Sequence, residues 1–97
     1  MSLILDGSSG TTGNLANGDL QVNGVTVGKG GSTLSDNTAV GISALNSATT
    51  GNYNTALGYQ SLQANADGTY NTALGRKSLL TNTSGTLNVG VGDSALR

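Results

Sequence analysis

The chain has 97 residues, only four basic and five acidic side chains, and a formal net charge of −1. So few and scattered basic residues exclude the footprint of a nucleic-acid-binding protein, and the absence of His and Cys excludes disulfides, imidazole or thiolate metal sites and Ser-His-Asp or Cys-His catalysis. Leu, Ile and Val together supply 21 residues and Gly supplies 16, so the composition indicates either a low-complexity linker or a thin, repetitive β structure completed by partner chains.

The first residues predict a short strand followed by a connector. Residues 3–7, Leu-Ile-Leu-Asp-Gly, are typical of a strand that ends in an Asp-Gly turn. Residues 8–14 contain only Ser, Gly, Thr and Asn, which bury little and tolerate turns. No apolar run reaches the roughly 18 residues that cross a membrane, so we expect no membrane insertion.

Residues 19–28 predict a β-hairpin. Asn23 and Gly24 form the dipeptide that is most typical of a two-residue type I′ turn. Such a turn places Val22 opposite Val25. It also places Leu20 opposite Val27, so that all four apolar side chains share one face. Because an isolated hairpin is marginal in water, we expect this face to pack on another copy or on another protein.

From residue 37 onward the chain repeats itself every 17 residues. The units span 37–53, 54–70 and 71–87, with a divergent partial unit at 88–97, and they share the pattern Asn-Thr-Ala-Val/Leu-Gly-x-x-Ser/Ala-Leu. Self-similarity at a fixed period indicates stacked units, each of which buries its apolar face only against its neighbours.

Each unit predicts one strand and one polar turn. The strands are expected at 38–41, 55–58 and 72–75, and a Leu follows each of them (Leu45, Leu62 and Leu79). The residue before each Leu stays small, which indicates close approach of backbones (Ala44, Ser61, Ser78 and Ala95). One Gly per polar stretch is expected to take positive φ (Gly51, Gly68 and Gly85). Residues 60–65 are also compatible with a single helical turn.

An asparagine opens every unit, at positions 37, 54, 71 and 88. Stacked about 4.8 Å apart, these side chains can form a hydrogen-bonded ladder. Alternatively, each Asn merely tolerates a left-handed turn conformation. Both interpretations are open at this point, and both make the asparagines structural.

No pattern for catalysis, a cofactor or a metal ion is found, and we expect none of the three. The acidic residues are all Asp, lie beside Gly, Asn or turns, and do not recur in register, whereas glycosidases need carboxylates paired about 5–9.5 Å apart. Tyr53 and Tyr70 lie one period apart and in register with Leu87, which favours core or interface packing over glycan binding. Tyr59 falls in a variable position and is expected to be exposed.

The repeats resemble those of tail fibre proteins of tailed bacteriophages, and are more distantly similar to the β-roll heads of trimeric autotransporter adhesins. The opening Met-Ser-Leu-Ile-Leu-Asp-Gly and the segment Leu-Gln-Val-Asn-Gly-Val-Thr-Val-Gly-Lys-Gly at 20–30 also resemble the start of such fibres. The resemblance implies a mainly β virion protein: an elongated homotrimer of short-strand repeats, either a β-solenoid (β-roll) or an intertwined triple β-helix.

The resemblance also implies two parts. Residues 1–32 form an N-terminal anchor segment, with the hairpin at about 19–28, that attaches the fibre to a tail, baseplate or adaptor protein. Residues 33–97 form the shaft that supports host adsorption, and host surface glycan is a partner of a part further downstream. Because the fourth unit stops at Arg97, we expect the chain to be the N-terminal part of something longer. The alternative function is an adhesin whose repeats themselves bind host surface glycan.

Overall fold

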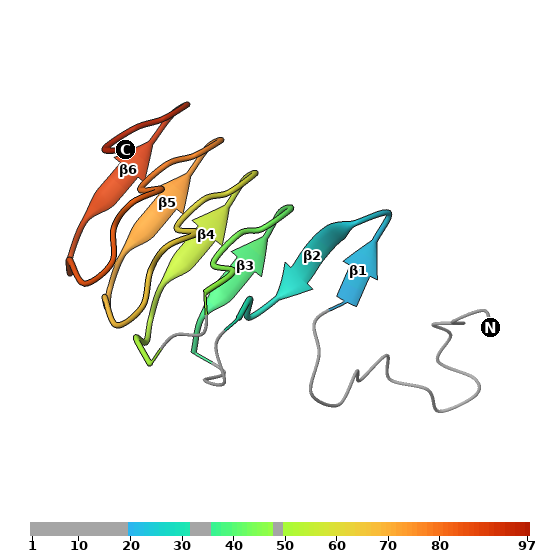
Figure 1. Cartoon of the computed structure of the whole chain (residues 1–97), viewed down its shortest axis with the longest axis horizontal. Coiled ribbons are helices and arrows are strands. Elements are labelled where there is room, and N and C mark those ends of the chain that lie inside the picture. Colours follow the sequence, from blue (N-terminus) through green and yellow to red (C-terminus); the bar gives the residue numbers. More distant parts are fainter. Residues whose placement is uncertain (1–19, 32–35, 48–49) are drawn as a thin grey trace.

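The computed structural model describes residues 20–31, 36–47 and 50–97, and within these ranges it contains strands and no helix (Figure 1). The strands are β1 (Leu20–Val22), β2 (Val25–Gly28), β3 (Thr38–Val40), β4 (Thr55–Leu57), β5 (Thr72–Leu74) and β6 (Val89–Val91). They form one sheet in chain order, which confirms a mainly β chain of short strands. The strand predicted at 3–7 and the connector at 8–14 lie outside the described residues.

β1 and β2 form the predicted hairpin. Val22 pairs with Val25 and Leu20 pairs with Val27, the register expected from a two-residue turn. Both turn residues take positive φ, as a type I′ turn requires (Asn23 at 50° and Gly24 at 87°). The local turn chemistry and the alternation of apolar residues therefore specify the same structure.

The hairpin continues into the sheet of the repeats. β2 pairs antiparallel with β3, with Val27 opposite Val40 and Gly28 opposite Ala39. In addition, the Gly41 N–H donates to the Thr26 carbonyl oxygen at 2.9 Å. One sheet therefore contains strands from both sides of residue 32, where the anchor segment was predicted to end.

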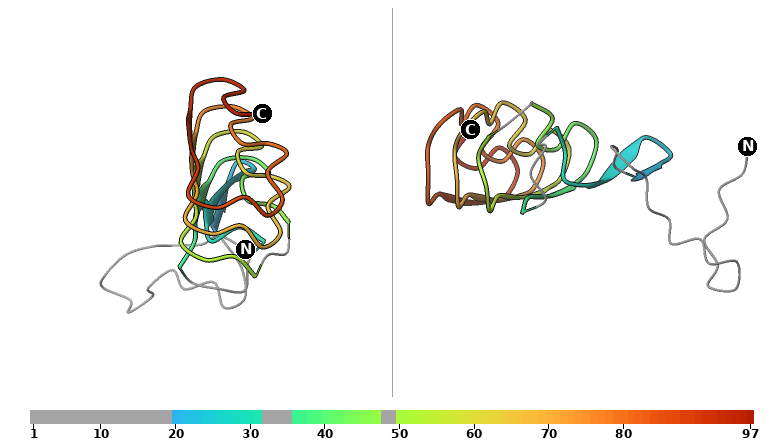
Figure 2. Two further views of the ribbon diagram at one scale, coloured as in Figure 1. Left: turned by 90° about the vertical axis from the view of Figure 1, so that its left-hand side faces the viewer. Right: turned by 90° about the horizontal axis from the view of Figure 1, so that it is seen from below.

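β3 to β6 are parallel and are offset from one another by one unit. Ala39 pairs with Ala56, and Ala56 pairs with Ala73. Hydrogen bonds also join equivalent positions outside the strands: the Leu45 N–H donates to the Ser61 carbonyl oxygen at 2.8 Å. Seen end-on, successive units overlie one another (Figure 2). The parallel order follows because each connection is long enough to bring the chain back to the starting end of the next strand.

Consecutive β-turns follow each repeat strand, in place of the possible helical turn. In the second unit the Ser61 N–H donates to the Gly58 carbonyl oxygen at 3.2 Å, and the Gln63 N–H donates to the Gln60 carbonyl oxygen at 3.3 Å. Gln60 and Leu62 have φ of 58° and 51°. These values lie in the left-handed region, which a right-handed helix does not use. The same pair recurs at Ser43 and Leu45, Lys77 and Leu79, and Ser94 and Leu96.

The glycines of the polar stretches have a different role from the predicted one. Gly51, Gly68 and Gly85 do not take positive φ. A Cβ atom at Gly51 would instead overlap the Gly68 carbonyl oxygen, and one at Gly68 would overlap that of Gly85. Gly is needed there because neighbouring backbones approach closely. Positive φ occurs at the Gly that follows each repeat strand, 139° at Gly41 and 134° at Gly58, and the repeat strands end one residue earlier than predicted.

A narrow core of small side chains and Leu fills the stack. The central Ala of β3, β4 and β5 is fully buried and clusters with the following Leu of each unit (Ala39, Ala56, Ala73, Leu45, Leu62 and Leu79). The small residue before each of these Leu is buried, which fits the close approach of backbones that its size predicted (Ala44, Ser61 and Ser78). The Ser78 hydroxyl donates to the Gly90 carbonyl oxygen at 2.8 Å, so even the polar side chains of the interior serve the contact between units.

The asparagines that open the units form a ladder through the backbone. Nδ2 of Asn54 donates to the Gly68 carbonyl oxygen at 2.8 Å, and its Oδ1 accepts from the Asn71 N–H at 3.0 Å. One unit later, Asn71 makes the same two bonds to Gly85 and Asn88, at 2.7 and 3.0 Å. Each Asn therefore ties the loop of its own unit to the backbone of the next. The left-handed conformation belongs to the preceding residue, so that interpretation of the asparagines is wrong (Tyr53, Tyr70 and Leu87).

Candidate interaction surface

The described part of the chain assembles no metal site. It holds no group of three or more His, Cys, Asp or Glu that could bind an ion. No helix long and apolar enough to cross a bilayer is found among the described residues. Asp36 and Asp67 are exposed and lie in separate turns or bends.

The sheet of the repeats has one buried face and one exposed face, because side chains alternate along each strand. In β4 and β5 the central Ala is buried, whereas the Thr before it and the Leu after it are exposed. β6 shows the same alternation with a buried Gly at its centre. The face opposite the buried Ala39, Ala56 and Ala73 is called the outer face below.

One apolar residue from every strand lines up on the outer face. The Cα pairings join them in sequence from β1 to β6. The apolar row consists of Leu20, Val27, Val40, Leu57, Leu74 and Val91. Four of its members are 42 to 63% exposed, and the other two, Leu20 and Val40, are half-buried. The hairpin face and the outer face of the repeats are therefore one continuous apolar surface.

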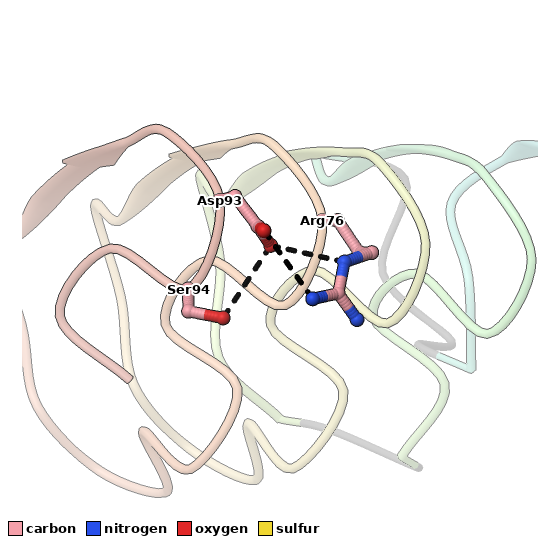
Figure 3. Close-up of polar contacts among 3 residues, drawn as sticks. All are labelled: Arg76, Asp93 and Ser94. Atoms are coloured by element: carbon pink, nitrogen blue, oxygen red, sulfur yellow. Dashed lines mark hydrogen bonds and ion pairs between the residues drawn. The ribbon is translucent and has the colours of Figure 1, made fainter.

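A second column of exposed side chains, called the corner column below, lies two residues after the end of each repeat strand (Ile42, Tyr59, Arg76 and Asp93). Arg76 Nε lies 3.0 Å from Asp93 Oδ1, and Arg76 Nη2 donates to Asp93 Oδ2 at 3.3 Å (Figure 3). The Ser94 hydroxyl donates to Asp93 Oδ1 at 3.4 Å. Since the two charges are opposite and adjacent, the corner column has no net charge.

Tyr53 and Tyr70 stack ring on ring, with centroids 5.0 Å apart and planes inclined by 18°. The pair lies on the surface of the chain, where the two side chains are 53% and 55% exposed, so the prediction of core packing is wrong and interface packing stays a prediction. Leu87, in the same register, is 76% exposed, and Tyr59 is exposed as predicted. Each stacked ring covers one face of the other. The stacking therefore removes one face of each ring from contact with a sugar.

Sequence reasoning identified the hairpin half of this surface, but neither the half on the repeats nor the connection between the two. It placed Leu20 and Val27 on one face of the hairpin, as the structure does. It treated the Val or Leu of each repeat only as a strand former, although its alternation with buried Ala is visible in Thr-Ala-Leu. No local pattern predicts the pairing of β2 with β3, which joins the two halves.

Comparison of the chain with protein-family models, with curated proteins and with solved structures finds no match.

Proposed function

We propose that this chain is a structural component of a bacteriophage tail fibre and acts in the virion as a homotrimer. Residues 1 to about 32 attach the fibre to a tail, baseplate or adaptor protein. Residues 33–97 form the proximal shaft as a β-solenoid that supports host adsorption. The chain has no enzymatic role, and neither nucleic acid nor a membrane interior is its partner.

The observation that carries this proposal is the residue-for-residue register of β3 to β6. In such a stack each 17-residue unit adds one strand spacing, about 4.8 Å, to the length. The asparagine ladder and the close backbone contacts at glycine hold successive units together. The described residues form a body of 44 × 24 × 18 Å. Length with stiffness is what a shaft requires.

Trimerisation is supported by what the single chain leaves uncovered. The apolar row runs along the whole sheet with four of its six members exposed, and a contiguous apolar surface of this kind is typical of a protein interface. In a closed ring of identical copies, the apolar surface of every copy is covered by its neighbours, and no copy is left with an uncovered apolar surface.

Two measurements test the proposal. Sedimentation equilibrium of the chain should give three times its 9.5 kDa mass, and a stable, folded monomer would contradict the trimer. Gold-labelled antibodies against the chain should mark the tail-proximal part of the fibres on phage particles. Label on the capsid, or on no part of the particle, would contradict the assignment to the fibre.

The second candidate, an adhesin that binds host glycan through its repeats, draws on the exposed Tyr53 and Tyr70. Binding of the full chain to a glycan array, lost in the Tyr53→Ala/Tyr70→Ala variant and kept in Tyr59→Ala, would support it. An array without signal would leave the shaft as the better proposal.

A further inference from the structure

We infer that the apolar row is the surface through which copies of this chain pack on one another, side by side, parallel and at the same height. The inference rests on the proposed fibre function and specifies the interface that the trimer would use. It commits to a second copy of this chain as the occupant of the outer face.

The row is not needed for the core of the single chain. Ala56 and Leu62 are fully buried on the opposite side of the sheet and belong to the core cluster. The row members Leu57 and Leu74 remain 44% and 42% exposed. Apolar side chains that recur on every strand yet point to solvent are explained by a partner that covers them.

Two properties of the row favour a copy of the same chain over an unrelated partner. The first is its spacing: side chains recur at the strand spacing of about 4.8 Å, and a second copy has the same ridges and grooves at the same interval. The second is its charge. The row contains no charged residue, and the nearby Arg76 and Asp93 neutralise each other within one chain, so copies can approach without repulsion.

The hairpin specifies the height of the copies, because it differs from the repeats that follow it: β2 pairs antiparallel with β3, whereas β3 to β6 are parallel. A copy that slips by one unit would place its hairpin against a repeat of the other chain instead of against the like hairpin. The parallel direction follows from the proposed function, because a fibre attached by its N-terminal segment has all copies pointing the same way.

Cysteine cross-linking tests the surface and the height together, because the chain has no cysteine of its own. A disulfide forms only where the two Cα atoms come within about 4.4–6.8 Å. Val40→Cys and Leu74→Cys are each prepared as single variants and oxidised with diamide. The matched control is Ser84→Cys, an exposed position in the loop between β5 and β6.

We expect each row variant to yield a covalent dimer of like positions at least tenfold faster than the Ser84→Cys control. In a co-refolded mixture of Val40→Cys and Val91→Cys, peptide mass spectrometry should find Val40-site to Val40-site links in excess over mixed links. An excess of mixed links would mean an antiparallel arrangement and would overturn the inference. An excess of mixed links in a mixture of Leu57→Cys and Leu74→Cys would show that the copies are displaced by one unit. This result would overturn the inference that they lie at the same height.

A second variant separates failure of this inference from failure of the proposed function. Leu57→Asp/Leu74→Asp places carboxylates in the middle of the row, and we expect a folded monomer by circular dichroism and sedimentation. If the unmodified chain is a trimer but cross-linking at the row is no faster than at Ser84, the trimer uses another face and only this inference fails. If the unmodified chain is a folded monomer, both fail.

Discussion

Val27 of the hairpin and Val40 of the first unit are direct partners in the antiparallel pairing of β2 with β3. This contact places an antiparallel strand on the first edge of a parallel stack. A free edge of this kind exposes unpaired N–H and C=O groups and invites association with other strands. The hairpin therefore both covers the edge of β3 and extends the apolar row beyond the repeats.

Removal of one asparagine should weaken the contact between units. Asn71→Ala eliminates the bonds to the Gly85 carbonyl oxygen and from the Asn88 N–H, at 2.7 and 3.0 Å, and leaves both backbone groups without that partner. We expect the free energy of unfolding to fall by about 2–4 kcal/mol, measured by denaturant titration at one fixed protein concentration. Asn46→Ala, at an exposed asparagine, should change it by less than about 0.5 kcal/mol. Equal effects would contradict the role given to the ladder.

The glycine after each strand should not tolerate Ala. Gly58 has φ of 134°, and a Cβ there would lie 2.6 Å from the Gly75 carbonyl oxygen. Gly58→Ala should therefore lower stability by about 2–6 kcal/mol through backbone strain and overpacking. Gly24 also has positive φ, but a Cβ there meets nothing within 4 Å. Gly24→Ala should lower stability by only about 1–2 kcal/mol, and thermal melts of the two variants should show the difference.

One substitution should stabilise the fold. Lys77 has φ of 59°, a region that Asn occupies more readily than Lys. Lys77→Asn should therefore raise the free energy of unfolding by up to about 1 kcal/mol. Thr83→Asn, at an exposed position without positive φ, is the control and should give no gain. If the two variants melt at the same temperature, the left-handed residues of the turns carry no measurable strain.

The ion pair at the corner should contribute little stability. The Arg76 and Asp93 side chains are 51% and 63% exposed, so water and salt screen their attraction. A double-mutant cycle with Arg76→Met and Asp93→Asn should give a coupling energy below about 1 kcal/mol, reduced further in 1 M NaCl. A coupling of several kcal/mol, insensitive to salt, would show that this pair is buried in an assembly.

The sequence by itself determined the features that depend on near neighbours in the chain. The Asn-Gly turn specified the hairpin register, because positive φ at two adjacent residues leaves few alternatives. The 17-residue period located the repeat strands, since equivalent residues of stacked units must coincide. Close packing at the small position before each Leu also followed from the repeat, and Ser61, for example, is buried there.

Only the tertiary structure decided what depends on the distance between one unit and the next. Gly51 needs to be Gly because the backbone at Gly68 lies against it, not because of its own φ. Asn54 bonds to backbone groups on two sides, which its recurrence did not reveal. The apolar row also depends on a contact between distant segments. It is continuous because β2 pairs with β3, and local propensity and periodicity do not predict that pairing.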